Sequence, residues 1–238
     1  MCSPTPPSTL KKSNHRVIIV NSPKIISRLL KGEHEVRMAQ KLVYQVFVEE
    51  MDWIPTKDNP SLIRFIEDND GSKLFVDDFD DVAMWFGSFY NQKLIACWRF
   101  CEQKNGKFEL ERYHAIPEFI RTSKNLEVTR LVVHPEYRKR LRVLLDLSQT
   151  AHKYLGQRFD HTFAAVQFPY PGNVYLKLGL KKANSKPFKY SYLDKNEVEL
   201  IFMDFKDKRT LASGYRGLSH KCTENENVYK AEIISLQR

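Results

Sequence analysis

The sequence contains few cysteines and no arrangement of them that is typical of a metal site. Its four cysteines form no C-x-x-C pair, and none of its seven histidines belongs to a pair with metal-ligand spacing. Cys97 and Cys101 on one strand would lie about 13 Å apart, too far for a disulfide. We therefore expect no metal site, and we expect these two cysteines to be small core residues.

The sequence also lacks a long apolar run. No segment approaches the roughly 18 apolar residues of a membrane helix, and residues 1–16 lack the hydrophobic core of a signal peptide. We therefore expect a cytoplasmic protein with no membrane span. Of the 238 residues, 42% are hydrophobic and 12% are aromatic, which indicates a globular chain rather than a disordered one.

The net charge of the chain is +9 at pH 7. A basic excess is compatible with nucleic acid as a partner, but the sequence has no zinc-finger, RNA-recognition or helix-turn-helix signature, so we expect no nucleic acid. An acidic protein partner fits the charge equally well, because a basic surface speeds the encounter with it.

The hydrophobic pattern predicts one α/β domain at residues 17–205. A Pro-, Ser- and Lys-rich flexible arm at 1–16 precedes it, and a polar accessory tail at 206–238 follows. Residues 51–73 are polar and broken by Pro, which predicts mainly loop. The predicted strands are 17–20, 82–90, 93–101, 108–113, 128–133, 162–168, 188–193 and 197–205. The predicted helices are 23–30, 35–50, 117–121, 143–155 and 173–178.

Residues 126–155 form the stretch around which the rest of the chain is organised. A β-branched strand at 128–133 ends at His134-Pro135, and an amphipathic helix follows a basic loop. A helix N-terminus exposes unpaired N–H groups, so this junction is a candidate phosphate site. The alternative is a solvated basic turn. The cations of the loop are Arg138, Lys139, Arg140 and Arg142.

The run VVHPEYRKRLRV resembles the first half of the acyl-CoA-binding motif of GCN5-related N-acyltransferases (GNAT), V-x-P-x-x-R-x-x-G-x-G/A. Val133, Pro135 and Arg138 match this motif. Leu141 and Val143 stand where the family usually has small residues. We expect their side chains to obstruct a pyrophosphate, which disfavours free coenzyme A as the donor.

Two further resemblances narrow the family. PGNVYLKLGL is similar to the family segment N-x-x-x-x-Y-x-K-x-G-F. The acyl-homoserine-lactone synthases and the long-chain N-acyl amino acid synthases, one branch of the superfamily, share F-x5-W, D-x-F-D, R-F and E-x-[ST]-R. The lactone synthases also carry an Arg where this chain has Val43, which disfavours S-adenosylmethionine as the acceptor. The matching residues are Phe47, Trp53, Asp77, Phe79, Asp80, Arg99, Phe100, Glu127, Thr129, Arg130, Tyr175 and Gly179.

The resemblance implies a GNAT-like α/β fold with a mixed, mostly antiparallel central sheet. This sheet is splayed at its centre and has helices on both faces. The implied reaction is the attack of an amine on an acyl thioester, which gives an amide and a free thiol. The donor substrate is acyl-phosphopantetheine on acyl carrier protein, or acyl-CoA, and no cofactor is expected to be tightly bound.

The same resemblance suggests roles for individual residues. Strand alternation would aim Glu127, Thr129, Leu131 and Val133 at one face of the sheet, where Glu127 would be the base and Tyr175 a proton donor to the thiolate. A structural ion pair between Glu127 and Arg130 is the alternative. The candidate acceptor-binding residues are Phe47, Trp53, Asp77, Asp80, Arg99, Thr129 and Arg130. The candidate donor-binding residues are Leu131, Val132, Val133, Arg138, Lys139, Arg140, Leu141, Arg142, Val143 and Asn173.

We therefore expect an N-acyltransferase that moves a long acyl group from acyl carrier protein to a small amine such as an amino acid. Three alternatives stay open. They are an acyl-homoserine-lactone synthase that uses S-adenosylmethionine, an acetyl-CoA-dependent acetyltransferase, and a non-catalytic module that binds a lipid or an acidic partner.

Overall fold

A computed structural model describes residues 24–122, 124–189 and 196–207. The predicted strand at 17–20, the N-terminal arm and nearly all of the C-terminal tail lie outside these residues. Within the described part of the chain, no helix is both long and apolar enough to cross a membrane.

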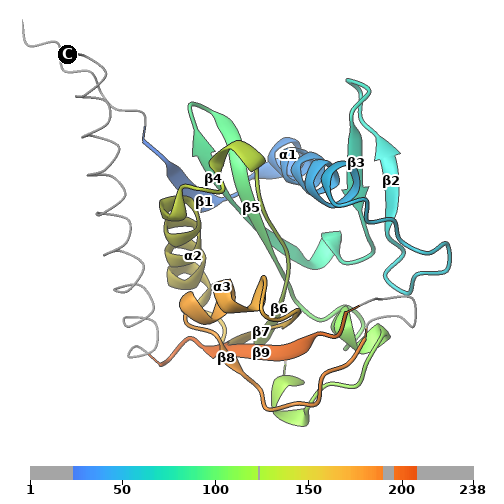
Figure 1. Ribbon diagram of the computed structural model, residues 1–238, viewed down its shortest axis with the longest axis vertical. Coiled ribbons are helices and arrows are strands. Elements are labelled where there is room, and N and C mark those ends of the chain that lie inside the picture. Colours follow the sequence, from blue (N-terminus) through green and yellow to red (C-terminus); the bar gives the residue numbers. More distant parts are fainter. Residues whose placement is uncertain (1–23, 123, 190–195, 208–238) are drawn as a thin grey trace, which may run out of the picture.

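The centre of the molecule is a seven-stranded sheet in the order β1-β4-β5-β6-β7-β9-β8 (Figure 1). All neighbouring strands are antiparallel except β6 and β7, which are parallel. The sheet is therefore mixed and mostly antiparallel, as predicted. Its strands are β1 (Ile26–Leu29), β4 (Ala83–Tyr90), β5 (Lys93–Cys101), β6 (Asn125–Val133), β7 (His161–Val166), β8 (Lys181–Lys182) and β9 (Glu199–Asp204).

Helices cover both faces of this sheet (Figure 1). α1 (Gly32–Tyr44) continues as a π-helix over Gln45–Glu50 and packs on one face, against a core that includes Trp85 and Cys97. α2 (Leu141–Leu155) and α3 (Gly172–Lys177) pack on the other face, against Phe86 and Trp98. Strand alternation separates the two cores, and the predicted layers are confirmed.

A third apolar cluster covers the β7 and β9 half of the sheet, on the same face as α1. The connection between β5 and β6 supplies Phe108 and Leu110 to it, and the sheet supplies Phe163. Phe163 is paired with Glu127, and Thr129 is paired with Arg99, so these side chains share one face. The α1 face therefore has two apolar halves, and polar residues of β5 and β6 lie between them.

Three sequence predictions about secondary structure are wrong, and a fourth, the strand at 188–193, is described only at its first two residues. Residues 26–29 form the edge strand β1 rather than a helix, because they pair with β4. Residues 64–67 form β2 (Arg64–Glu67), which pairs with β3 (Lys73–Val76) where loop was expected. Leu110–Arg112 is a 3-10 helix rather than a strand. Phe188 makes only an isolated bridge to Val198, and residues 190–195 lie outside the described chain.

The central feature of the sheet is a β-bulge in β6. The register places both Arg130 and Leu131 opposite Trp98, and Arg130 has a positive φ of 54°. The extra residue shifts the alternation of the strand. Thr129 and Val132 therefore face α1, whereas Leu131 and Val133 pack on the α2 side. The prediction that Leu131 and Val133 share a face with Glu127 is wrong for this reason.

The predicted splay is also present. β6 pairs with β7 only over Asn125–Glu127, and beyond Glu127 it pairs only with β5. The two parallel strands therefore separate at the residue that was expected to act as the base, immediately before the bulge.

Candidate functional site

Six ionisable side chains meet on the α1 face beside the bulge, and we call them the arginine–carboxylate cluster. They come from the segment after β3, from β5, from the connection between β5 and β6, and from β6. The members of the cluster are Asp77, Asp80, Arg99, Glu109, Glu127 and Arg130.

Arg99 is the centre of the cluster and is only 1% exposed. Its Nε donates to Thr129 Oγ1 at 2.8 Å. Its Nη1 donates to Asp77 at 2.8 Å and to Asp80 at 2.9 Å. Its Nη2 donates to Glu109 at 2.7 Å. Since an unpaired buried charge costs several kcal/mol, these bonds explain how a fully buried arginine is tolerated in a central strand.

Arg130 lies on the outer side of the cluster. Its Nη2 donates to Asp77 at 2.7 Å and to Glu109 at 2.9 Å. Its guanidinium lies 4.9 Å from the centre of the Phe75 ring, which is a cation–π contact. Its Nε is buried and has no hydrogen-bond partner among the described residues. Arg130 therefore keeps one buried donor that the described residues leave without an acceptor.

Glu127 makes different contacts from the other carboxyl groups. Both of its oxygens accept from the backbone N–H of Leu110, at 3.2 and 3.0 Å, and it makes no direct ion pair with either arginine in the described structure. Burial, together with the nearby charge of Glu109, raises the pKa of Glu127 to about 8. At pH 7 the carboxyl group is therefore mostly protonated. The alternative prediction, an ion pair with Arg130, is wrong.

The pKa values of the two aspartates in the cluster are shifted in opposite directions. Burial raises the pKa of Asp80, even though Arg99 lies beside it. Burial also opposes the charge of Asp77, but Arg99 and Arg130 together hold the pKa of Asp77 well below its ordinary value. The cluster contains four carboxyl groups and two guanidinium groups. Its acidic groups therefore outnumber its basic groups, which favours a cationic ligand such as an ammonium group.

An aromatic wall adjoins the cluster. Phe47 and Trp53 lie 6.3 Å apart, and both lie 5.8 Å from Phe75, whose ring contacts Arg130. Trp53 is 39% exposed, so the wall reaches the surface. The structure thus brings together all seven residues predicted to bind the acceptor. Phe75 was not among the predicted residues.

The two predicted catalytic residues lie on opposite faces of the sheet. Tyr175 is buried in the α2-side core, 6.1 Å from Trp98 between ring centres, whereas Glu127 faces the α1 side. Burial raises the pKa of the Tyr175 hydroxyl, which therefore stays protonated at neutral pH. A substrate that contacts both residues must therefore reach across the sheet, and β6 and β7 stop pairing beyond Glu127.

Two arginines of the basic loop before α2 already make contacts within the protein. Arg138 forms a bidentate ion pair with Glu50 and donates to the carbonyl of Val133 at 3.0 Å. Arg140 stacks over the rings of Tyr90 and Tyr137, each 5.2 Å away. The remaining predicted donor residues of the surface, Lys139, Arg142 and Asn173, are exposed.

The side chains of Leu141 and Val143 do not project from the loop. Val143 is fully buried in the α2-side core, and Leu141 packs against that core. The expectation that they would obstruct a pyrophosphate is therefore wrong, because both side chains point inward from the first turn of α2. No steric argument against coenzyme A remains at these positions.

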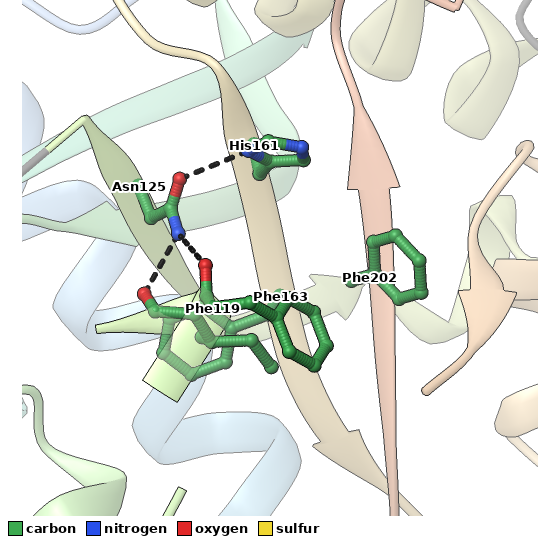
Figure 2. Close-up of a pocket in the computed structure, with 6 residues that line it drawn as sticks. Phe119, Asn125, His161, Phe163 and Phe202 are labelled. Carbon is green, nitrogen blue, oxygen red and sulfur yellow. Dashed lines mark hydrogen bonds between the residues drawn. The ribbon is translucent and has the colours of Figure 1, made fainter. Parts of the chain in front are cut away.

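Two hollows lie elsewhere on the structure. Figure 2 shows one at the start of β6, where Asn125 bonds to the carbonyls of Phe119 and Ile120 and to the His161 ring. These polar groups bond to one another, so their position at this hollow is explained by contacts within the protein and does not require a ligand. The other is an open cleft of about 350 Å³ on the outer side of Leu110–Arg112, lined by residues 107, 111–116 and 121.

Glu109 is the cluster residue that sequence reasoning missed. It is buried and bonds to both arginines. Its segment, FELER, matched no motif, and the predicted strand at 108–113 gave its side chain no defined direction. Its unusual feature, a buried acid between the buried side chains of Phe108 and Leu110, becomes visible only when the turn is folded against β6.

Comparisons with known proteins agree with the fold. Residues 42–147 match the family model described as an acetyltransferase (GNAT) domain, and no curated protein sequence matches the chain. FeeM, an N-acyl amino acid synthase from uncultured soil microbes, is 14% identical with a TM-score of 0.55, over 80% of this chain and 96% of that one.

Two lactone synthases of known structure are also similar in fold to the chain. BjaI, a CoA-dependent acyl-homoserine lactone synthase, is 14% identical with a TM-score of 0.58, over 82% of this chain and 90% of that one. The AHL synthase LasI is 12% identical with a TM-score of 0.57, over 81% of this chain and 95% of that one. At these identities the likeness is one of fold. The segment 42–147 is thus similar to GNAT acyltransferase domains, and the fold of the chain resembles that of the N-acyl amino acid and acyl-homoserine-lactone synthases.

Proposed function

We propose that this protein transfers an acyl group, in the cytoplasm, from a phosphopantetheine thioester to the amine of a small acceptor such as an amino acid. The observation that carries the proposal is the arginine–carboxylate cluster. It is buried, it lies beside the splay of β6 and β7, and it combines an excess of acidic groups over basic groups with one unpaired donor on Arg130.

The acceptor binds between the cluster and the aromatic wall. Its ammonium group is attracted by the carboxylates of the cluster, and this attraction is strong where water is excluded. A carbonyl or carboxylate oxygen of the acceptor receives the Nε–H of Arg130. Phe47, Trp53 and Phe75 contact the rest of the molecule and shield it from water. The residues would thus hold the amine in a fixed orientation.

The reaction needs a base for the ammonium proton. A base works best when its pKa is close to the working pH, and the pKa of Glu127 is about 8. The ionised form of Glu127 takes one proton from the acceptor ammonium group, and the nitrogen then attacks the thioester carbonyl carbon. The carbon–sulfur bond breaks and the nitrogen releases its second proton to give the amide, which balances the proton that the thiolate takes up. The thiolate then takes a proton to form a thiol of pKa about 8.5, for which Tyr175 is the proposed donor.

The donor enters through the splay, with its phosphate at the start of α2. The first N–H groups of that helix have no acceptor within the helix. Lys139 and Arg140 are exposed and have no ion-pair partner in the described part of the chain. We favour acyl carrier protein as the donor because these cations suit an acidic surface as well as a phosphate. Acyl-CoA presents the same phosphopantetheine arm and is the alternative donor.

A lactone synthase reaction with S-adenosylmethionine is the second candidate. The relevant position is Val43, which is fully buried in the α1-side core. No charged group from this position reaches the arginine–carboxylate cluster, so we place this reaction behind acyl transfer to a simple amine.

The test is a purified-protein assay with one acyl group presented on acyl carrier protein and on coenzyme A, together with a panel of small amines. Thiol release and the mass of the product are measured. We expect amine-dependent thiol release and a new amide. Absence of amine-dependent release with both donors would overturn the proposed function.

A pair of variants tests the carrier separately. Arg140→Glu reverses a charge at the start of α2, and Arg158→Glu makes the same change just after the other end of this helix, over 20 Å away at 1.5 Å per residue. If the carrier docks on the basic loop, Arg140→Glu raises the KM for the carrier-bound donor at least tenfold. Arg158→Glu leaves it unchanged. Equal KM values in both variants would remove the carrier from the proposal.

A further inference from the structure

Glu109 is held in place from two sides. The peptide N–H that follows it, at Leu110, is bonded to both oxygens of Glu127. Its own carboxylate places one oxygen on Arg99 and the other on Arg130. Glu109 therefore links the connection between β5 and β6 to the bulge strand, and its side chain has little freedom to turn away.

The position of Glu109 limits what Arg130 can bind. Nη2 of Arg130 is shared between Asp77 and Glu109, so it is not available to a ligand. A carboxylate normally binds an arginine through two parallel N–H groups. Here Nε is the buried donor that remains unpaired among the described residues, and Nη2, which would complete a fork with it, already donates to two carboxylates.

We propose that Glu109 is a positioning residue that determines acceptor specificity, by occupying Arg130 Nη2 and disfavouring acceptors that carry a free carboxylate. Among the small acceptors of the proposed function, free amino acids are then poorer substrates than amines whose neighbouring carbonyl is uncharged, such as amino acid amides, esters or peptide N-termini. This inference rests on the proposed function, because it assigns a substrate class to the same site.

Two physical effects act in the same direction. An acceptor carboxylate at Arg130 Nε would lie close to the negative oxygens of Glu109, and repulsion between like charges is strong in a buried site. At Nε such a carboxylate would also receive only one hydrogen bond, because Nη2 is occupied, whereas an amide carbonyl needs only one. The site therefore loses little when the carboxylate of the acceptor is replaced by a carboxamide.

The experiment compares the full-length wild type with Glu109→Gln and with the matched control Glu111→Gln. Glu111 lies in the same 3-10 segment and supports the same connection, because it accepts from the N–H of Phe108 and pairs with Arg121. It makes no contact with either cluster arginine in the described structure. Values of kcat and KM are measured for phenylalanine and for phenylalanine amide with one acyl donor.

We expect the wild type to prefer the amide. In Glu109→Gln the ratio of kcat/KM for the acid to that for the amide rises at least tenfold, mainly through a lower KM for the acid. In Glu111→Gln the ratio stays at the wild-type value. An unchanged ratio in Glu109→Gln would overturn the specificity role and leave the proposed function intact, provided that the wild type turns over either acceptor.

A measurement on the wild type alone covers the case in which Glu109→Gln does not fold. Inhibition constants are determined for 3-phenylpropionate and 3-phenylpropionamide, which lack the amine. Tighter inhibition by the amide supports the inference, and tighter inhibition by the carboxylate contradicts it. Absence of turnover of any amine by the wild type would instead count against the proposed function.

Discussion

Replacement of Glu127 by Gln gives a quantitative test of how this buried carboxyl group affects stability. The ordinary carboxyl pKa of 4.5 rises to about 8 in the folded protein. Between these pH values the folded state keeps a proton that the unfolded state has released. The free energy of unfolding therefore falls as the pH rises, by about 1.4 kcal/mol per pH unit.

The expected change in unfolding free energy follows from the pH interval between the two pKa values of Glu127. From pH 5 to pH 8 the wild type loses about 4 kcal/mol of stability through Glu127 alone, a large part of the 5–15 kcal/mol that is typical of whole domains. Gln has nearly the same shape, and its side-chain oxygen can accept the N–H of Leu110, but it does not titrate. The Gln variant should therefore be more stable than the wild type at pH 8.

The assay is urea unfolding at pH 5, 6, 7 and 8, with linear extrapolation to water. The stability difference between Glu127→Gln and wild type should increase with pH by about 1.4 kcal/mol per unit. Glu136→Gln, which changes a carboxyl group that is 70% exposed, is the control and should show no such slope. A difference that is constant from pH 5 to pH 8 would refute the proposed protonation of Glu127.

The remaining predictions concern ion pairs. Asp77→Asn removes one of the two carboxylates that Arg99 and Arg130 share and should cost about 3–5 kcal/mol of unfolding free energy, so a loss below about 1 kcal/mol by urea unfolding would contradict the assigned burial. Arg138→Gln removes a partly exposed pair with Glu50 and should cost no more than about 1 kcal/mol. A larger loss in the same assay would show that this pair holds the loop before α2.

Much of the fold could be predicted because its signals are local. The two residues between the strands of the β4 and β5 hairpin, Asn91 and Gln92, both adopt positive φ, which is the geometry that a two-residue hairpin turn requires. The apolar stripe of α2 likewise predicts its buried face. That stripe includes Val143, so helical periodicity already indicated that its side chain points inward.

The bulge and Glu109 could not be predicted in the same way. A bulge adds one residue to a strand, and in a run such as LVV, where every residue is apolar, alternation carries no information about which face each residue takes. Glu109 reaches Arg130 across 21 residues of sequence and depends on a turn held by Glu127. Its role follows from tertiary contacts, for which the local pattern has no signal.

Asp77, Asp80 and Arg99 could be predicted from the sequence only in part. Burial of an arginine in β5 requires carboxylate partners, and Asp77 and Asp80, which the sequence predicted at the same site, provide them. Glu127 shares a face with Thr129, as predicted, but not with Leu131 and Val133, and its partner is the N–H of Leu110 rather than Arg130. The sequence thus indicated which polar residues gather at the site, whereas the structure was needed to show which of them bond to one another.

The most direct test of the account is the rate of thiol release from an acyl thioester by the purified protein, measured with and without a small amine. The account predicts release that depends on the amine, that yields an amide of the expected mass, and that rises with pH through about 8 as Glu127 loses its proton. Thiol release that is independent of the amine, or absent with both carrier-bound and CoA-bound donors, would contradict it.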